Sequence, residues 1–127
     1  MALTNPGYRP RLVDPVIGRY LGIFGGVSIE GPKWTGKTWT AEHHASSEFK
    51  LTGSTGPMRN IDIAISDPNA ALKGASPHLI DEWQDHPMLW DLVRNSIDES
   101  PEKGLYILTG SSVPKRDSYS HSGAGRI

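Results

Sequence analysis

The sequence predicts an α/β domain in which helices cover both faces of a mainly parallel sheet. Three apolar runs, at 27–30, 78–82 and 105–109, are typical of buried strands. Segments with a helical apolar face alternate with them, which is the pattern of right-handed βαβ crossovers. The chain contains no internal repeat, so we expect a single domain over residues 1–127.

The composition narrows the class of protein. The chain has 127 residues, of which 36% are hydrophobic and 21% charged, and its formal net charge is −1. This is enough apolar material for a core, and a near-neutral balance gives no indication of nucleic acid or membrane as a partner. The lack of cysteine excludes disulfides and thiolate zinc sites. No segment resembles a signal peptide or a membrane span, so a cytoplasmic protein is expected.

In the first half, residues 1–13 form an irregular lead-in, because proline and glycine recur there. A short amphipathic helix is expected over 14–23, with Asp-Pro at its start. Gly25-Gly26 ends it, and a strand follows at 27–30. A second helix spans 37–47. Its side chains are predicted to face inward at Trp39, Ala41 and Ala45, and largely outward at Glu42, His43 and His44.

In the second half, a short strand is expected at 48–51, before a loop at 52–57 rich in glycine, serine and threonine. Residues 59–65 are equally compatible with a strand and a helix, because 61–65 alternates yet adjoins the helix-opening pair Asp67-Pro68. A short helix at 68–72 and a longer one at 87–99 follow. The longer helix presents Leu89, Trp90, Val93 and Ile97 to the sheet. The tail at 113–127 has little to bury and is expected to be flexible.

The most specific motif is G-x-x-x-x-G-K-T at 31–38, between a predicted strand and a predicted helix. This is the phosphate loop (Walker A motif) of P-loop nucleoside triphosphatases. Gly31 and Gly36 let the backbone approach an anion, and the amide groups of the loop point inward at a helix start. Lys37 supplies an ammonium for the β- and γ-phosphates, and the Thr38 hydroxyl is a ligand for Mg²⁺. We therefore expect nucleotide binding by Gly31, Pro32, Lys33, Trp34, Thr35, Gly36, Lys37, Thr38 and Trp39.

A second motif, Asp81-Glu82, forms the C-terminal end of the strand predicted at 78–82. The carboxyl ends of parallel strands share one edge, so this Walker B pair should lie beside the phosphate loop. We assign Asp81 to Mg²⁺ and Glu82 to the attacking water as orienting group or base. The alternative is that the pair only solvates a strand end. Thr109, Ser111 or Ser112, at the end of the next strand, could sense the γ-phosphate; each could equally be a turn residue, and Thr109 is slightly favoured.

Other groups of residues are weaker candidates. Trp34 and Trp39 either cover a nucleotide or pack on the outside of the loop, and packing is favoured. His78, Asp81, Glu82, Asp85 and His86 resemble a metal cluster, but neighbouring strand residues face opposite sides, so no dedicated metal site is expected. The pair His43-His44 is expected to be at the surface.

Five motifs in this order resemble the prokaryotic AAA-type ATP-binding proteins that carry a conserved C-terminal region of unknown function. They are Gly-Pro-Lys-Trp-x-Gly-Lys-Thr-Trp (31–39), Leu-Ile-Asp-Glu-Trp-Gln (79–84), Trp-Asp-x-Val-Arg (90–94), Ile-Leu-Thr-Gly-Ser (107–111) and His-Ser-Gly-x-Gly-Arg-Ile (121–127). The resemblance implies a three-layer P-loop sandwich with strand order 5-1-4-3-2. It also implies phosphate and Mg²⁺ contacts by Lys37 and Thr38, a metal and water carboxylate pair, and a sensor at 109–111.

Family members are longer, so the resemblance implies an N-terminal fragment without its fifth strand and lid. The C-terminal region of a longer protein and a homo-oligomer are then possible partners. Arg126 matches a family arginine, and its role as an arginine finger is a hypothesis. Three functions follow: a Mg²⁺-dependent ATPase, a nucleotide-gated switch without turnover, and, less favoured, a small-molecule kinase. Glu82 directly after Asp81 favours water over another acceptor.

Overall fold

The computed structural model describes residues 12–31, 36–111 and 127. Its elements in chain order are α1 (Asp14–Leu21), β1 (Gly26–Glu30), α2 (Lys37–His44), β2 (Ser47–Lys50), β3 (Ser54–Thr55), β4 (Met58–Arg59), α3 (Asn60–Ser66), α4 (Pro68–Leu72), β5 (His78–Asp81), the 3₁₀ turn η1 (Trp83–Asp85), α5 (Met88–Asp98) and β6 (Tyr106–Gly110). The lead-in predicted at 1–13 and the tail predicted at 113–127 lie almost entirely outside the described residues.

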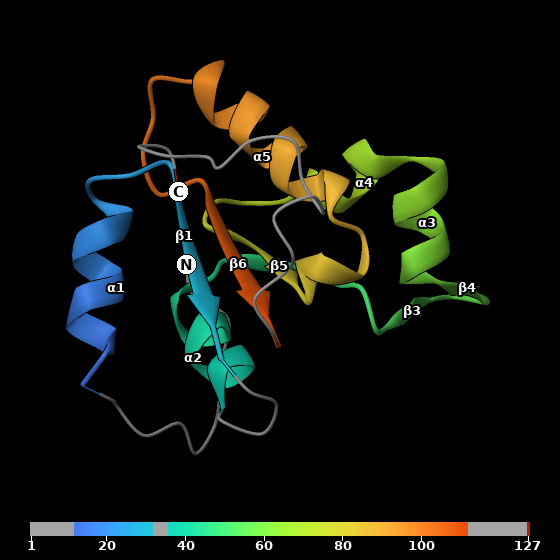
Figure 1. Cartoon of the computed structure of the whole chain (residues 1–127), viewed down its shortest axis with the longest axis horizontal. Helices are drawn as coiled ribbons and strands as arrows, with labels where there is room; N and C mark the ends of the chain where they lie inside the picture. Colours follow the sequence, from blue (N-terminus) through green and yellow to red (C-terminus); the bar gives the residue numbers. More distant parts are fainter. Residues whose placement is uncertain (1–11, 32–35, 112–126) are drawn as a thin grey trace.

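Four parallel strands form the sheet in the order β1-β6-β5-β2 (Figure 1). The α/β fold class predicted from the sequence is confirmed. The order differs in detail from the predicted 5-1-4-3-2, because the described residues include no fifth strand and a small hairpin takes the labels β3 and β4. If only the strands of this sheet are numbered, β1, β2, β5 and β6 become strands 1, 2, 3 and 4, and their order is 1-4-3-2. β6 therefore lies between β1 and β5, as expected.

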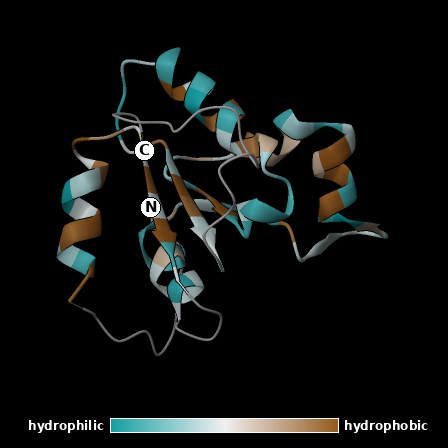
Figure 2. Cartoon of the chain, viewed as in Figure 1, coloured by the Kyte–Doolittle hydropathy of each residue, from teal (hydrophilic) through white to brown (hydrophobic). Residues whose placement is uncertain are grey.

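Helices cover both faces of the sheet, with α5 at the top of Figure 1 and α2 at the bottom. Because neighbouring strand residues point to opposite faces, Leu79 packs with the α2 layer while Ile80 packs with the α3–α5 layer. Ile107 and Leu108 on β6 divide in the same way. In Figure 2 the inner strands are brown and much of α5's outer surface is teal. The result is a three-layer arrangement with a core on each side of the sheet.

Several helical predictions are confirmed. Leu89, Trp90, Val93 and Ile97 are the buried residues of α5. Gly25 must lack a side chain because a Cβ there would lie 2.3 Å from Ile97 Cγ2. The ambiguous segment at 59–65 is helical from Asn60 onward, as α3, while Arg59 ends β4. Asn60 begins this helix and ties it to the preceding loop: its side-chain amide donates to the Lys50 carbonyl at 2.8 Å and accepts from the Thr55 hydroxyl at 2.6 Å.

Three orientations predicted on α2 are wrong. Glu42 was expected to face outward, but its side chain is only 12% exposed and its Oε2 lies 3.2 Å from Lys50 Nζ. Trp39 was expected to face inward, but it is 50% exposed. His44 was expected at the surface, but its side chain is only 15% exposed and contacts Asp14 of α1, with 2.9 Å between Nε2 and Oδ1. His44 and Glu42 are covered by contacts with α1 and β2, which a pattern within α2 alone does not indicate.

Candidate functional site

The carboxyl ends of β1, β5 and β6 meet at one edge of the sheet, and α2 begins beside them. Asp81 is in register with Thr109, which in turn is in register with Ile29. Gly36 precedes α2 with φ 79°, a left-handed conformation that favours glycine. The amide of Gly31 donates to the Gly110 carbonyl at 3.2 Å, which ties the start of the phosphate loop to β6. The sequence motifs therefore converge on this edge.

Asp81 is 5% exposed and is held by two hydroxyl donors. Thr38 Oγ1 donates to Asp81 Oδ1 at 2.9 Å, and Thr109 Oγ1 donates to the same oxygen. Thr109 also accepts the Glu82 amide at 3.2 Å. Thr109 is completely buried, so it lies beneath the edge of the sheet and fixes the end of β5 rather than facing the open side.

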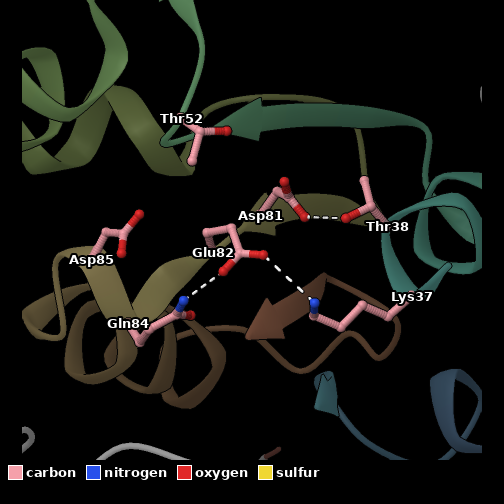
Figure 3. A pocket seen from close by; sticks show the side chains of 7 residues that line it. All are labelled: Lys37, Thr38, Thr52, Asp81, Glu82, Gln84 and Asp85. Carbon is pink, nitrogen blue, oxygen red and sulfur yellow. Dashed lines mark hydrogen bonds and ion pairs between the residues drawn. The ribbon is translucent and has the colours of Figure 1, made fainter. Parts of the chain in front are cut away.

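Glu82 has an unusual backbone for its residue type, with φ 62° and ψ 48°. A left-handed conformation at a residue with a side chain is uncommon and carries strain. It turns the chain from β5 into η1 and directs the Glu82 carboxylate towards Lys37 (Figure 3). The distance from Lys37 Nζ to Glu82 Oε1 is 3.6 Å, and Lys37 Nζ lies 3.3 Å from Ser111 Oγ. Lys37 is itself 8% exposed.

The Glu82 carboxylate has two further donors: the Ser111 hydroxyl, 2.6 Å from Oε2, and the Gln84 side-chain amide. Burial by itself would raise the pKa of the Glu82 carboxyl. The hydrogen bonds from Ser111 and Gln84 and the Lys37 ammonium outweigh burial and hold this pKa below its ordinary value. Glu82 is therefore ionised at neutral pH, as a proton acceptor has to be.

A cavity of about 340 Å³ opens between these groups, lined by Lys37, Thr38, Thr52, Asp81, Glu82, Gln84 and Asp85 (Figure 3). Its size is within the range of small-molecule sites, about 300–1,000 Å³. Sequence reasoning missed Thr52 and Gln84, and it weighed Asp85 only as part of a metal cluster. Gln84 and Asp85 follow the carboxylate pair after one residue, Trp83, so a turn after β5 could have indicated them. Thr52 carries no signal of its own.

Some predicted residues cannot be placed. Pro32, Lys33, Trp34, Thr35, Ser112 and Arg126 lie outside the described residues. Of the two sensor candidates that the structure describes, Thr109 and Ser111, it is Ser111 whose hydroxyl contacts both Lys37 and Glu82. Of the proposed metal cluster, His78 is buried and bonded to Ser47 and to the Ala71 carbonyl. Within the described ranges, no group of three His, Cys, Asp or Glu side chains is arranged to hold a metal ion.

The donor set nevertheless fits a nucleotide-bound Mg²⁺. Mg²⁺ prefers oxygen ligands, keeps several waters and commonly takes only one or two protein ligands together with phosphate oxygens. The Thr38 hydroxyl and the Asp81 carboxylate supply such oxygens 2.9 Å apart. Asp81 is also oriented by Thr109, which is the kind of supporting hydrogen bond that metal-binding carboxylates have.

This sheet, with a glycine-hinged loop entering a helix beside a strand-end carboxylate pair, defines the class of P-loop nucleotide-binding domains. The family model of the AAA domain matches residues 25–127. The chain belongs to this family, which supports a nucleotide-binding, P-loop ATPase-like function. No curated protein matches the chain. Among the described residues, no helix combines the length and apolarity needed to cross a bilayer.

Proposed function

We propose that this chain binds ATP together with Mg²⁺ and hydrolyses it. The observation that carries the proposal is the convergence of Lys37, Thr38, Asp81 and Glu82 on one cavity from two segments more than 40 positions apart. Family membership supports the nucleotide, and the resemblance described above favours adenine.

In the binding step, the phosphates lie at the start of α2, where amide groups and the helix dipole favour anions. Lys37 moves its ammonium from Glu82 to the β- and γ-phosphates. Thr38 and Asp81 hold Mg²⁺, which when bound neutralises charge on the phosphate oxygens. Asp81 keeps its hydrogen bond from Thr109, so its remaining oxygen stays aimed at the edge of the sheet.

In the chemical step, Glu82 orients a water molecule towards the γ-phosphorus and accepts its proton. The new bond joins the water oxygen to the γ-phosphorus, and the bond from the γ-phosphorus to the β-bridging oxygen breaks. Because hydrogen bonds keep the Glu82 pKa low, the carboxylate is in the accepting form before the water arrives. Ser111, at the end of β6, is the hydroxyl placed to sense the γ-phosphate beside Lys37 and Glu82. Thr109 acts from below the sheet edge by orienting Asp81.

One observation favours a second candidate, a nucleotide-gated switch without turnover. The Glu82 carboxylate is engaged by Ser111, Gln84 and Lys37, so it does not offer a free acceptor to water in this arrangement. Gln84 Oε1 is buried without a hydrogen-bond partner among the described residues. An unsatisfied buried acceptor costs free energy, so a different orientation of the Gln84 side chain would be favoured if it gave this oxygen a donor. Departure of Lys37 towards a phosphate removes one of the three contacts.

Substitution of Glu82 by glutamine separates the two candidates. Under the ATPase proposal, Glu82→Gln keeps Mg-ATP affinity within a few-fold and lowers phosphate release by about 10²–10⁴. The matched control is Glu48→Gln, which removes a carboxylate on β2 and should leave both quantities unchanged. Wild-type binding with no phosphate release above background would select the switch. No Mg-ATP binding by the wild-type chain would reject both.

A homo-oligomer and a cytoplasmic location are also part of the proposal. The family supports the homo-oligomer, and the cytoplasmic location rests on the sequence alone. Arg126 as a finger for a neighbouring subunit belongs with them.

A further inference from the structure

The Ser111 hydroxyl is bonded to the carboxylate that the proposed function assigns to water. Ser111 Oγ donates to Glu82, with 2.6 Å between Oγ and Oε2. The other two hydroxyls at this edge, those of Thr38 and Thr109, donate to Asp81 instead. An O–H···O⁻ bond of about 2.5–2.7 Å is a strong, charge-assisted one. The proposed base therefore already holds an alcohol.

The contact has the layout of an activated nucleophile. In such sites an alcohol lies within hydrogen-bond reach of a base, and a third group orients the base. Here the third group is the Gln84 side-chain amide, which also donates to Glu82 (Figure 3). Lys37 Nζ lies 3.3 Å from Ser111 Oγ and 3.6 Å from Glu82 Oε1. A γ-phosphate drawn to Lys37 therefore comes close to the Ser111 hydroxyl.

A second serine–glutamate pair provides a comparison. On β1, Ser28 Oγ lies 3.4 Å from Glu30 Oε1, and Glu30 is exposed. A hydrogen bond of this length at the surface is weak. The Glu82 side chain, in contrast, is only 13% exposed, and a lysine lies beside its contact with Ser111. Of these two serines, Ser111 is the one that combines a close base with a cation able to hold a phosphate.

We infer that Ser111 is a phosphoacceptor, to which the chain transfers the γ-phosphoryl group of its own bound Mg-ATP. The inference rests on the proposed function and adds an acceptor that competes with water for Glu82. Glu82 accepts the proton of the Ser111 hydroxyl, and a bond forms between Ser111 Oγ and the γ-phosphorus. The bond from the γ-phosphorus to the β-bridging oxygen breaks, and ADP leaves with its electron pair.

The product limits the reaction to one event per chain. A phosphoserine carries a charge of about −1.5 to −2 at neutral pH and three strong acceptor oxygens. Placed on Ser111, it pairs with the Lys37 ammonium and repels Glu82. The cation that a second triphosphate needs is then occupied. We therefore expect a single phosphoryl group per chain and weaker Mg-ATP binding by the modified chain.

The test is mass spectrometry of the intact wild-type chain after incubation with Mg-ATP. We expect a species heavier by one phosphoryl group, with the modification at Ser111 in the tryptic peptide 104–115. A label on the γ-phosphate should be transferred, and a label on the α-phosphate should not. Ser111→Ala should lose the modification, and Ser111→Thr, which keeps a hydroxyl, should retain it. The matched control Ser28→Ala should be modified as the wild type is.

A second variant tests the role of the base. Glu82→Gln cannot accept the hydroxyl proton, so it should slow the modification by about 10²–10⁴. A rate equal to that of the wild type would contradict the step written above, because the Ser111 proton would then go elsewhere.

The remaining outcomes separate the inference from the proposed function. Mg-ATP binding or phosphate release by a chain that stays unmodified rejects the inference and leaves the proposed function intact. A phosphoryl group on another residue of the peptide, or one that persists in Ser111→Ala, also overturns the inference. A wild-type chain that binds no Mg-ATP in a calorimetric titration rejects the proposed function, and the inference with it.

Discussion

Two regions of the molecule each combine two carboxylates with one lysine, and they differ in almost every other respect. The rim cluster, at the carboxyl edge of the sheet, consists of Lys37, Asp81 and Glu82. The β2 cluster lies on α2 and β2 and consists of Glu42, Glu48 and Lys50. In the β2 cluster the lysine Nζ lies 3.2 Å from Glu42 Oε2 and 3.9 Å from Glu48 Oε1.

The two clusters shift carboxyl pKa values in opposite directions. In the rim cluster, hydrogen-bond donors overcome burial and lower the pKa of Glu82. In the β2 cluster, burial and then the neighbouring Glu42 raise the pKa of Glu48 to about 7, and the attraction of Lys50 does not compensate. The composition of charges is the same, so charge alone does not decide the behaviour.

The difference lies in the neutral donors. The rim cluster has the hydroxyls of Thr38, Thr109 and Ser111 and the amide of Gln84 directed at its carboxylates. In the β2 cluster, the carboxylate of Glu42 adjoins Glu48 and raises its pKa. A carboxylate becomes a candidate for metal or proton chemistry when fixed donors surround it, as they surround Asp81 and Glu82. Single substitutions in each cluster test this difference.

Removal of the buried Thr109 hydroxyl beneath the rim cluster should lower stability by more than any change in the β2 cluster alters it. Thr109→Val keeps the shape of the side chain but deprives Asp81 of a donor and the Glu82 amide of its acceptor. We expect the free energy of unfolding in urea to fall by about 2 kcal/mol, since unsatisfied buried polar groups cost about 1–3 kcal/mol each.

The control for Thr109→Val is Thr40→Val on α2. Thr40 is 2% exposed, and its hydroxyl has no hydrogen-bond partner in the described part of the chain. The same substitution there should be neutral or slightly stabilising. Equal destabilisation by both variants would mean that Thr109 contributes only packing.

The β2 cluster should show a smaller effect that depends on pH. Because the folded-state pKa of Glu48 is raised from 4.5 to about 7, its contribution to stability is complete below pH 4.5 and is lost as the pH rises through about 7. Glu48→Gln does not titrate, so it should match the wild type near pH 4.5 and exceed it at pH 8. After allowance for solvent screening of this partly exposed group, we expect a gain of about 1 kcal/mol at pH 8. An equal difference in urea unfolding at both pH values would contradict the raised pKa.

The rim cluster could largely be predicted from the sequence, because local motifs identify its residues and one topological rule brings them together. The glycine-lysine-threonine loop and the apolar strands at 78–82 and 105–109 are local signals, and the shared edge of parallel strands brings them together. Family membership is consistent with the motifs that carried the resemblance.

The remaining features depend on contacts between distant segments. The burial of His44 requires Asp14, 30 positions earlier, and the helical state of 60–66 is accompanied by the Asn60 contacts with Lys50 and Thr55. The roles of Gln84 and Ser111 became visible only when η1 and β6 were placed on either side of Glu82. A pattern in one segment carries no information about such partners.

A comparison of Lys37 with Lys50 tests most directly whether the rim cluster binds the triphosphate. Mg-ATP is titrated calorimetrically into the wild-type chain, Lys37→Ala and Lys50→Ala. Each variant removes one ammonium from a cluster with two carboxylates, but only Lys37 stands at the start of α2 beside Thr38. We predict that Lys37→Ala weakens binding by about 100-fold or more, as expected when a charge-assisted contact is lost, and that Lys50→Ala changes it by less than about threefold. Equal affinities in Lys37→Ala and the wild type would contradict the assignment of the rim cluster to the triphosphate.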